Sequence, residues 1–193
     1  VFKNIEMFNK YYDKNQSLVL AVAHYGNWEW GILSISISSK QKMVGIYKKL
    51  NNIFFNNLLN KIRSKFGADL IEMKKTARYL IDEKEKCKIL GLLADQSPQK
   101  KDSKYWTTFL NQETSVYLGP EKISRNMHYP ILFCSMNKIK RGRYEIFIEE
   151  LCINPQKMSS GEILQVEKNM KRSVSEKLYY DVISRKTASL FSA

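Results

Sequence analysis

A histidine and a glutamate stand five positions apart in the stretch "AHYGNWEWG", residues 23–31. On one continuous helix that spacing turns the side chains by about 140°, so His24 and Glu29 cannot share a helical face. If His24 ends a strand and Glu29 lies in the first turn of a helix after a break at Gly26-Asn27, the carboxylate can fold back onto the imidazole. A carboxylate on one ring nitrogen fixes the tautomer and leaves the other nitrogen as a general base. We therefore predict that His24 and Glu29 form a catalytic pair, and a purely structural His–Glu pair is the alternative left open.

No serine stands beside this pair, so it is the His–acid half of a triad, and a substrate hydroxyl is the expected nucleophile. Two other apolar runs also end in polar residues: Lys48 follows "GIY" and Asp95-Gln96 follow "LA". Cations beside a helix start can bind an anion, although a solvated lysine pair has the same sequence. An aspartate at a strand end is also a common turn former. Because the carboxyl ends of parallel strands meet at one crevice, we expect these groups to lie together.

The elements that must position these residues follow from the apolar periodicity. Strands are predicted over residues 17–23, 42–47, 69–73, 87–94, 129–136 and 143–153. Helices are predicted over residues 1–14, 27–38, 51–67, 76–86, 119–127 and 159–183. Residues 98–113 lack a clear period and are expected to form a long loop. The alternation predicts a single α/β domain over residues 1–193, with a mostly parallel central sheet flanked by helices and a C-terminal antiparallel hairpin.

Composition narrows the function classes. The net charge of +13 indicates an acidic partner, whether nucleic acid, anionic lipid or an acidic protein. No run approaches twenty apolar residues, so no membrane-spanning helix is expected. The three scattered cysteines suggest neither a disulfide framework nor a metal site, and there is no glycine-rich phosphate loop and no G-x-S-x-G motif. No nucleic-acid-binding module is recognisable, so a basic nucleic-acid-binding domain stays only as the rival class.

The ordered set "HYGNWEW", "IYKKLNN", "IRSKFGADLI", "LADQSP" and "TTFLNQETSVYLGPEKISR" resembles the bacterial lipid A biosynthesis acyltransferases of the lauroyl/myristoyl type. The resemblance covers about residues 17 to 152, in a form similar to that of Bacteroidetes-like bacteria. It implies a glycerolipid-acyltransferase-like fold and catalytic roles for His24 and Glu29, which match an H-x4-[D/E] motif. The implied substrate-binding residues are Asn27, Lys48, Arg63, Asp95 and Gln96. At the position of Lys48 the family often has arginine.

The resemblance also implies the reaction: transfer of a fatty acyl chain from an acyl-carrier-protein thioester to a hydroxyl of a lipid A precursor, with no metal and no bound cofactor. The expected place is the cytoplasmic face of the bacterial inner membrane, held peripherally at the anionic surface. We expect the sequence to begin downstream of the apolar N-terminal helix usual in this family and to lack its usual C-terminal segment. The alternative within enzymes is an acyltransferase for another lipid, such as a lysophospholipid or an amino-acid lipid.

Overall fold

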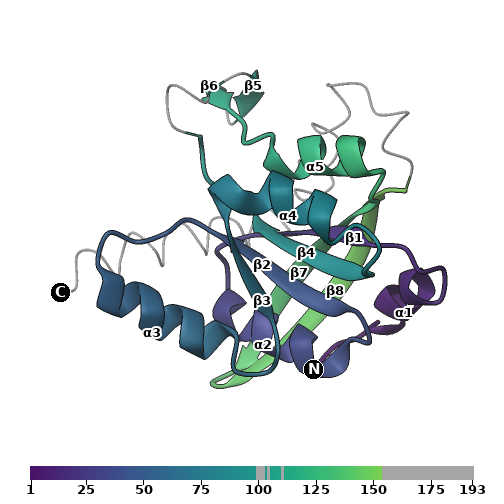
Figure 1. The fold of residues 1–193 in the computed structure, drawn as a ribbon. Helices are drawn as coiled ribbons and strands as arrows, with labels where there is room; N and C mark the ends of the chain where they lie inside the picture. The colour runs from purple at the N-terminus through teal and green to yellow at the C-terminus, as the bar shows by residue number, and fades with distance from the viewer. Residues whose placement is uncertain (99–102, 104, 110, 154–193) are drawn as a thin grey trace. The chain divides into compact units, whose positions relative to one another are not determined.

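The computed structural model describes residues 1–98, 103, 105–109 and 111–153, and the following description is restricted to them. A six-stranded sheet has the order β3-β2-β4-β1-β7-β8 (Figure 1). Its strands are β1 (Leu18–Val22), β2 (Lys42–Tyr47), β3 (Asp69–Glu72), β4 (Lys88–Leu93), β7 (Ile131–Lys140) and β8 (Arg143–Cys152). All neighbours pair in parallel except β7 and β8, which form an antiparallel hairpin. The predicted fold class is confirmed.

The strand order sets the position of the site. The chain leaves β1, passes through helix α2 (Trp28–Ser38) and enters β2, but β4 lies between those two strands. The carboxyl ends of β1 and β4 are therefore direct neighbours, with Val22 in register with Leu93. One more hydrogen bond, from the Ala94 N–H to the Val22 carbonyl at 3.0 Å, continues the pairing of the two segments just past the end of β4.

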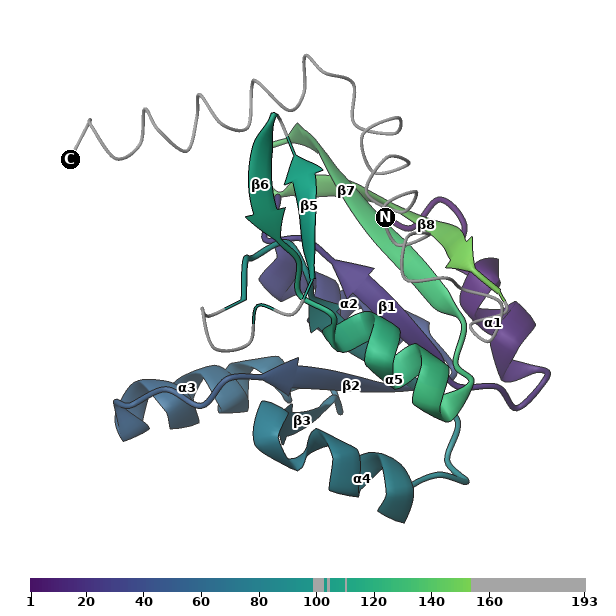
Figure 2. The same cartoon turned by 90° about the horizontal axis from the view of Figure 1, so that it is seen from above.

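Four further helices follow the predicted order. They are α1 (Glu6–Tyr12), α3 (Ile53–Arg63), α4 (Thr76–Asp82) and α5 (Gly119–Met127), with a short 3-10 turn, η1 (Met73–Lys75), before α4. Helix α5 begins with Pro120 in its first turn and packs along β1 and β7 (Figure 2). Thr76 is the first residue of α4, and Lys75 occupies the cap position.

The core lies between the sheet and its helices. Fully buried side chains from α1 and four strands form it: Phe8, Leu18, Leu20, Ile89, Leu132 and Ile148. Near-continuous apolar strands such as β1 and β4 are what a parallel sheet covered on both faces requires. Cys134 on β7 belongs to this cluster, and its burial raises the pKa of its thiol to about 12. That thiol is a packing group and not a nucleophile.

The predicted long loop at residues 98–113 is partly wrong. Two short strands, β5 (Trp106–Phe109) and β6 (Gln112–Ser115), form an antiparallel hairpin there. Asn111 makes the turn with a φ of 61°, a left-handed conformation that asparagine tolerates well. The strands are short and mostly polar, so no apolar run marks them.

Two sequence predictions extend past the described residues. The helix expected over residues 159–183 lies outside them, and the single-domain assignment over the whole chain stays a prediction. Within the described part of the chain, none of the helices has the length and apolar character needed to cross a bilayer.

Candidate active site

His24 and Asp95 lie side by side at the carboxyl ends of β1 and β4. Each follows its strand by two residues, so the register of Val22 with Leu93 brings them together. The imidazole Nδ1 lies 2.7 Å from Asp95 Oδ1, and the backbone N–H of His24 donates to Asp95 Oδ2 at 2.9 Å. One carboxylate thus fixes both the ring and the chain that carries it. With Nδ1–H as the donor, the neutral ring keeps Nε2 as a proton acceptor.

This geometry corrects the expected contact between Glu29 and His24. The Glu29 carboxylate receives two hydrogen bonds from Arg63, one from Nε to Oε2 at 2.8 Å and one from Nη2 to Oε1. Arg63 is the last residue of α3, and Glu29 lies in the first turn of α2. A two-pronged guanidinium–carboxylate pair is the strongest common ion-pair geometry and leaves the guanidinium other N–H donors. Glu29, the acidic residue of the H-x4-[D/E] motif, is therefore bound by Arg63, and Asp95 binds the imidazole of His24.

Trp28 contacts one member of each pair, His24 and Arg63. Its ring meets His24 edge to face, with centroids 5.1 Å apart and an interplanar angle of 78°. The Arg63 guanidinium carbon lies 5.4 Å from the indole centroid, within cation–π range. Trp28 is the contact that the sequence pattern did not predict. The signal was its place between Asn27 and Glu29 in a turn already singled out for chemistry.

The turn between β1 and α2 has little freedom. Gly26 has a φ of 63°, and a Cβ there would lie 3.1 Å from the sulfur of Met136 on β7. Asn27 caps α2, accepting a hydrogen bond at its side-chain oxygen from Trp30 N–H at 3.4 Å. The turn therefore packs directly against β7, with no room for a side chain at position 26. This close packing fixes the start of α2 relative to His24.

The other predicted residues lie at the surface of the same sheet edge. Lys48 directly follows β2, is exposed, and forms no ion pair with another described residue. Its neighbour Lys49 lies 3.9 Å from Glu72. Gln96 is exposed in the loop after Asp95. The structure therefore brings together four predicted residues, His24, Asp95, Glu29 and Arg63, and leaves Lys48 and Gln96 open to solvent.

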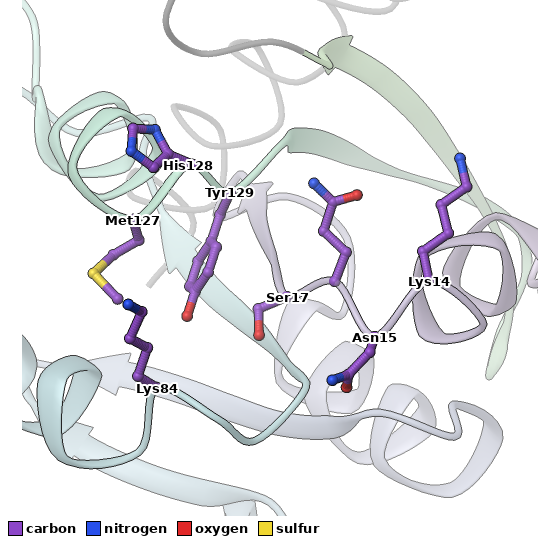
Figure 3. Close-up of a pocket in the computed structure, with 8 residues that line it drawn as sticks. Lys14, Asn15, Ser17, Lys84, Met127, His128 and Tyr129 are labelled. Carbon is purple, nitrogen blue, oxygen red and sulfur yellow. The ribbon is translucent and has the colours of Figure 1, made fainter.

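A hollow of about 290 Å³ lies at the other edge of the sheet (Figure 3). Its lining includes Ser17, just before β1, Lys84, shortly before β4, and Tyr129, shortly before β7. These residues precede the strands, whereas His24 and Asp95 follow them. The hollow is therefore separate from the paired residues. The described residues also contain no group of three histidine, cysteine or acidic side chains placed to bind a metal ion.

An imidazole held by a carboxylate at the carboxyl edge of an open α/β sheet is an arrangement suited to taking a proton from a bound substrate. A comparison with family models gives the particular family. The model for bacterial lipid A biosynthesis acyltransferases matches residues 2–179, and the chain belongs to that family. The protein is thus an acyltransferase of lipid A biosynthesis. No curated protein matches the chain significantly. The resemblance drawn from the motifs is confirmed at the level of the family, and the Bacteroidetes-like form stays a prediction.

Proposed function

We propose that the protein transfers a fatty acyl chain from an acyl-carrier-protein thioester to a hydroxyl of a lipid A precursor, with His24 as the general base. The supporting observation is the 2.7 Å contact between His24 Nδ1 and Asp95 Oδ1. Nε2 takes the proton from the acceptor hydroxyl as its oxygen attacks the thioester carbonyl. The tetrahedral intermediate then expels the carrier thiolate, which recovers the proton from the imidazolium. Bonds and charges balance without a covalent enzyme intermediate.

In this mechanism the two acids have different roles. Asp95 fixes the tautomer and stabilises the imidazolium while the proton is on the ring. Glu29, the acid that the resemblance makes catalytic, acts through Arg63 by holding the guanidinium beside Trp28, whose ring contacts His24. The N–H donors that Arg63 does not spend on Glu29 are suited to a phosphate or to the developing oxyanion.

The remaining site residues complete the proposal. Lys48 supplies a second cation at the same sheet edge, for a substrate phosphate or for the oxyanion. The backbone N–H groups of the turn at residues 25–28 are further donors to the oxyanion. Asn27 in this turn caps the start of helix α2. Gln96 follows Asp95 and is placed to contact the substrate from the β4 side.

The charge of the chain supports the proposed partners. A net charge of +13 favours both an acidic acyl carrier protein and an anionic lipid surface. We place the protein at the cytoplasmic face of the bacterial inner membrane as a peripheral protein, with no cofactor and no metal in the reaction.

An acyl-transfer assay with the full 193-residue chain tests the proposal. Donors are acyl carrier proteins loaded with different chain lengths and the matching coenzyme A thioesters, and acceptors are lipid A precursors and a lysophospholipid. We expect a new ester on the lipid A precursor, formed preferentially from the carrier protein, and its loss in His24→Gln. Transfer only to the lysophospholipid would favour the other-lipid alternative, and unchanged turnover by a folded His24→Gln variant would refute the mechanism.

A further inference from the structure

Helix α3 turns polar side chains inward. Asn56 is only 5% exposed, and its side-chain oxygen accepts a hydrogen bond from Leu50 N–H at 3.1 Å. The Asn60 amide donates to the Tyr47 hydroxyl at 3.0 Å. One and two turns along the same side of the helix from Asn56, Asn60 and Arg63 continue this polar row, and Arg63 binds Glu29. Hydrogen bonds and an ion pair thus hold the inner side of α3.

The outer face of α3 is apolar. Phe54 is 82% exposed, and Leu58 and Ile62, at successive four-residue steps, are 51% and 46% exposed. Phe55 adds an adjacent ring at 60%. Helices of globular proteins place such a stripe against the core and polar residues toward water. Here the order is reversed, so another apolar phase must cover the outer stripe, defined as Phe54, Phe55, Leu58 and Ile62.

The charged residues within and next to this stripe in the sequence are all basic. Residues 48–66 contain no aspartate or glutamate. Lys61 and Lys65 are exposed on or just after α3, and Lys48 and Lys49 precede it. A helix that combines exposed aromatic and aliphatic residues with flanking lysines matches an anionic bilayer interface, where apolar groups enter the acyl boundary and ammonium groups reach lipid phosphates.

Other occupants of the stripe do not match its charge. Residues 154–193 of this chain carry seven basic and four acidic residues, so they are net positive like α3. A second copy of a chain with net charge +13 is also positive. An acidic carrier protein would complement the charge of the lysines, but acidity alone does not account for the exposed rings of Phe54 and Phe55.

We propose that α3 is an interfacial docking helix, whose outer stripe enters an anionic membrane surface. The proposal rests on the proposed function in one respect, that the acceptor is a membrane lipid. Arg63, the last residue of α3, binds Glu29 and lies over Trp28, whose ring contacts His24. Docking through α3 therefore holds His24 close to the lipid surface.

Vesicle co-sedimentation of the full chain tests this docking. Vesicles of phosphatidylglycerol with phosphatidylethanolamine supply the anionic surface, and phosphatidylcholine vesicles supply the neutral one. We expect the double variant Phe54→Ser/Leu58→Ser to lower partitioning onto the anionic vesicles by about ten-fold or more, since it removes apolar side chains from the interface. Ile81→Ser, which changes a 71% exposed residue of α4, is the matched control and should leave partitioning unchanged. Charge reversal by Lys61→Glu/Lys65→Glu should weaken binding to anionic vesicles and leave binding to neutral vesicles unchanged.

Wild-type partitioning by the double variant overturns the proposal. So does a fall in the unfolding temperature like that of a core mutant, which would show that the chain itself covers the stripe, or a change from dimer to monomer without lipid, which would show a second copy. Transfer to a detergent-dispersed acceptor separates this test from the proposed function. The double variant should keep its turnover there within about two-fold, whereas failure of the wild-type chain in that assay would count against the acyl-transfer proposal and not against docking.

Discussion

The carboxyl and amino ends of the parallel strands form two edges of the sheet, and their polar side chains are arranged differently. At the carboxyl edge, side chains are joined in defined pairs, His24 with Asp95 by a hydrogen bond and Arg63 with Glu29 by an ion pair. At the amino edge, Lys14 and Lys84 line a hollow of about 290 Å³. The amino edge has a defined hollow, whereas the carboxyl edge has an imidazole and a guanidinium that carboxylates hold in a fixed geometry. An active site is recognised here by an oriented imidazole, not by the size of a cavity.

The largest expected effect comes from removing the base. His24→Ala should lower kcat by roughly a hundred- to ten-thousand-fold, the range for loss of a general base. The ring is part-exposed and its contacts are local, so the variant should keep the wild-type circular dichroism spectrum and unfolding temperature. Turnover close to wild type by such a folded variant would remove the carboxyl edge from the chemistry.

The second prediction separates the two acids at this edge. Asp95→Asn should lower kcat by about a hundred-fold or more, because the amide cannot stabilise the imidazolium and can hold the wrong tautomer. Glu29→Gln should cost less, about ten-fold, because its carboxylate acts through Arg63. Steady-state kinetics of both variants check this ranking. A larger loss of kcat in Glu29→Gln would return the catalytic acid to the H-x4-E motif.

The third prediction concerns the cations of the edge. Lys48→Met should lower kcat/KM by about ten-fold or more, since a charge-assisted contact contributes roughly 1.5–3 kcal/mol. Lys49→Met is the matched control, because Lys49 already lies beside Glu72. A fall in kcat would indicate a role at the oxyanion, and a rise in KM would indicate uniform substrate binding. No effect of either change would show that the pair is only a solvated turn.

The smallest effect is expected at the amino edge. Lys84 lines the hollow, away from the His24–Asp95 and Arg63–Glu29 pairs. The kcat and KM of Lys84→Met should stay within about two-fold of the wild-type values, as is usual for a surface substitution outside the active site. A large loss of kcat would mean that the hollow takes part in the reaction and that the contrast between the edges is wrong.

Most of the sheet could be predicted from the sequence because its strands are long apolar runs, such as "SLVLAVA" and "CKILGLLA", closed by polar turns. The hairpin at Trp106–Ser115 could not, because its strands are short and polar and depend on cross-strand pairing. The partner of His24 could not be predicted either. Glu29 is near in sequence, whereas Asp95 is 71 residues away and becomes adjacent only because β4 inserts next to β1.

Helix α3 shows a different limit. Its apolar periodicity identifies the helix and the residues that share a face, including Leu58 and Ile62. Periodicity does not say whether that face is buried by protein. The inward hydrogen bonds of Asn56 and Asn60 decide the orientation, and these depend on partners in the preceding strand and loop.

The tautomer of His24 gives the sharpest test of the histidine–aspartate pairing. The chain has only two histidines, so ¹⁵N NMR of the imidazoles needs one assignment variant, His24→Gln. In the neutral ring of the wild type we expect a protonated Nδ1, with its proton shifted downfield by Asp95, and an unprotonated Nε2. Asp95→Asn should abolish this pattern and Glu29→Gln should preserve it. A pattern that survives Asp95→Asn and disappears in Glu29→Gln would contradict the pairing and the mechanism built on it.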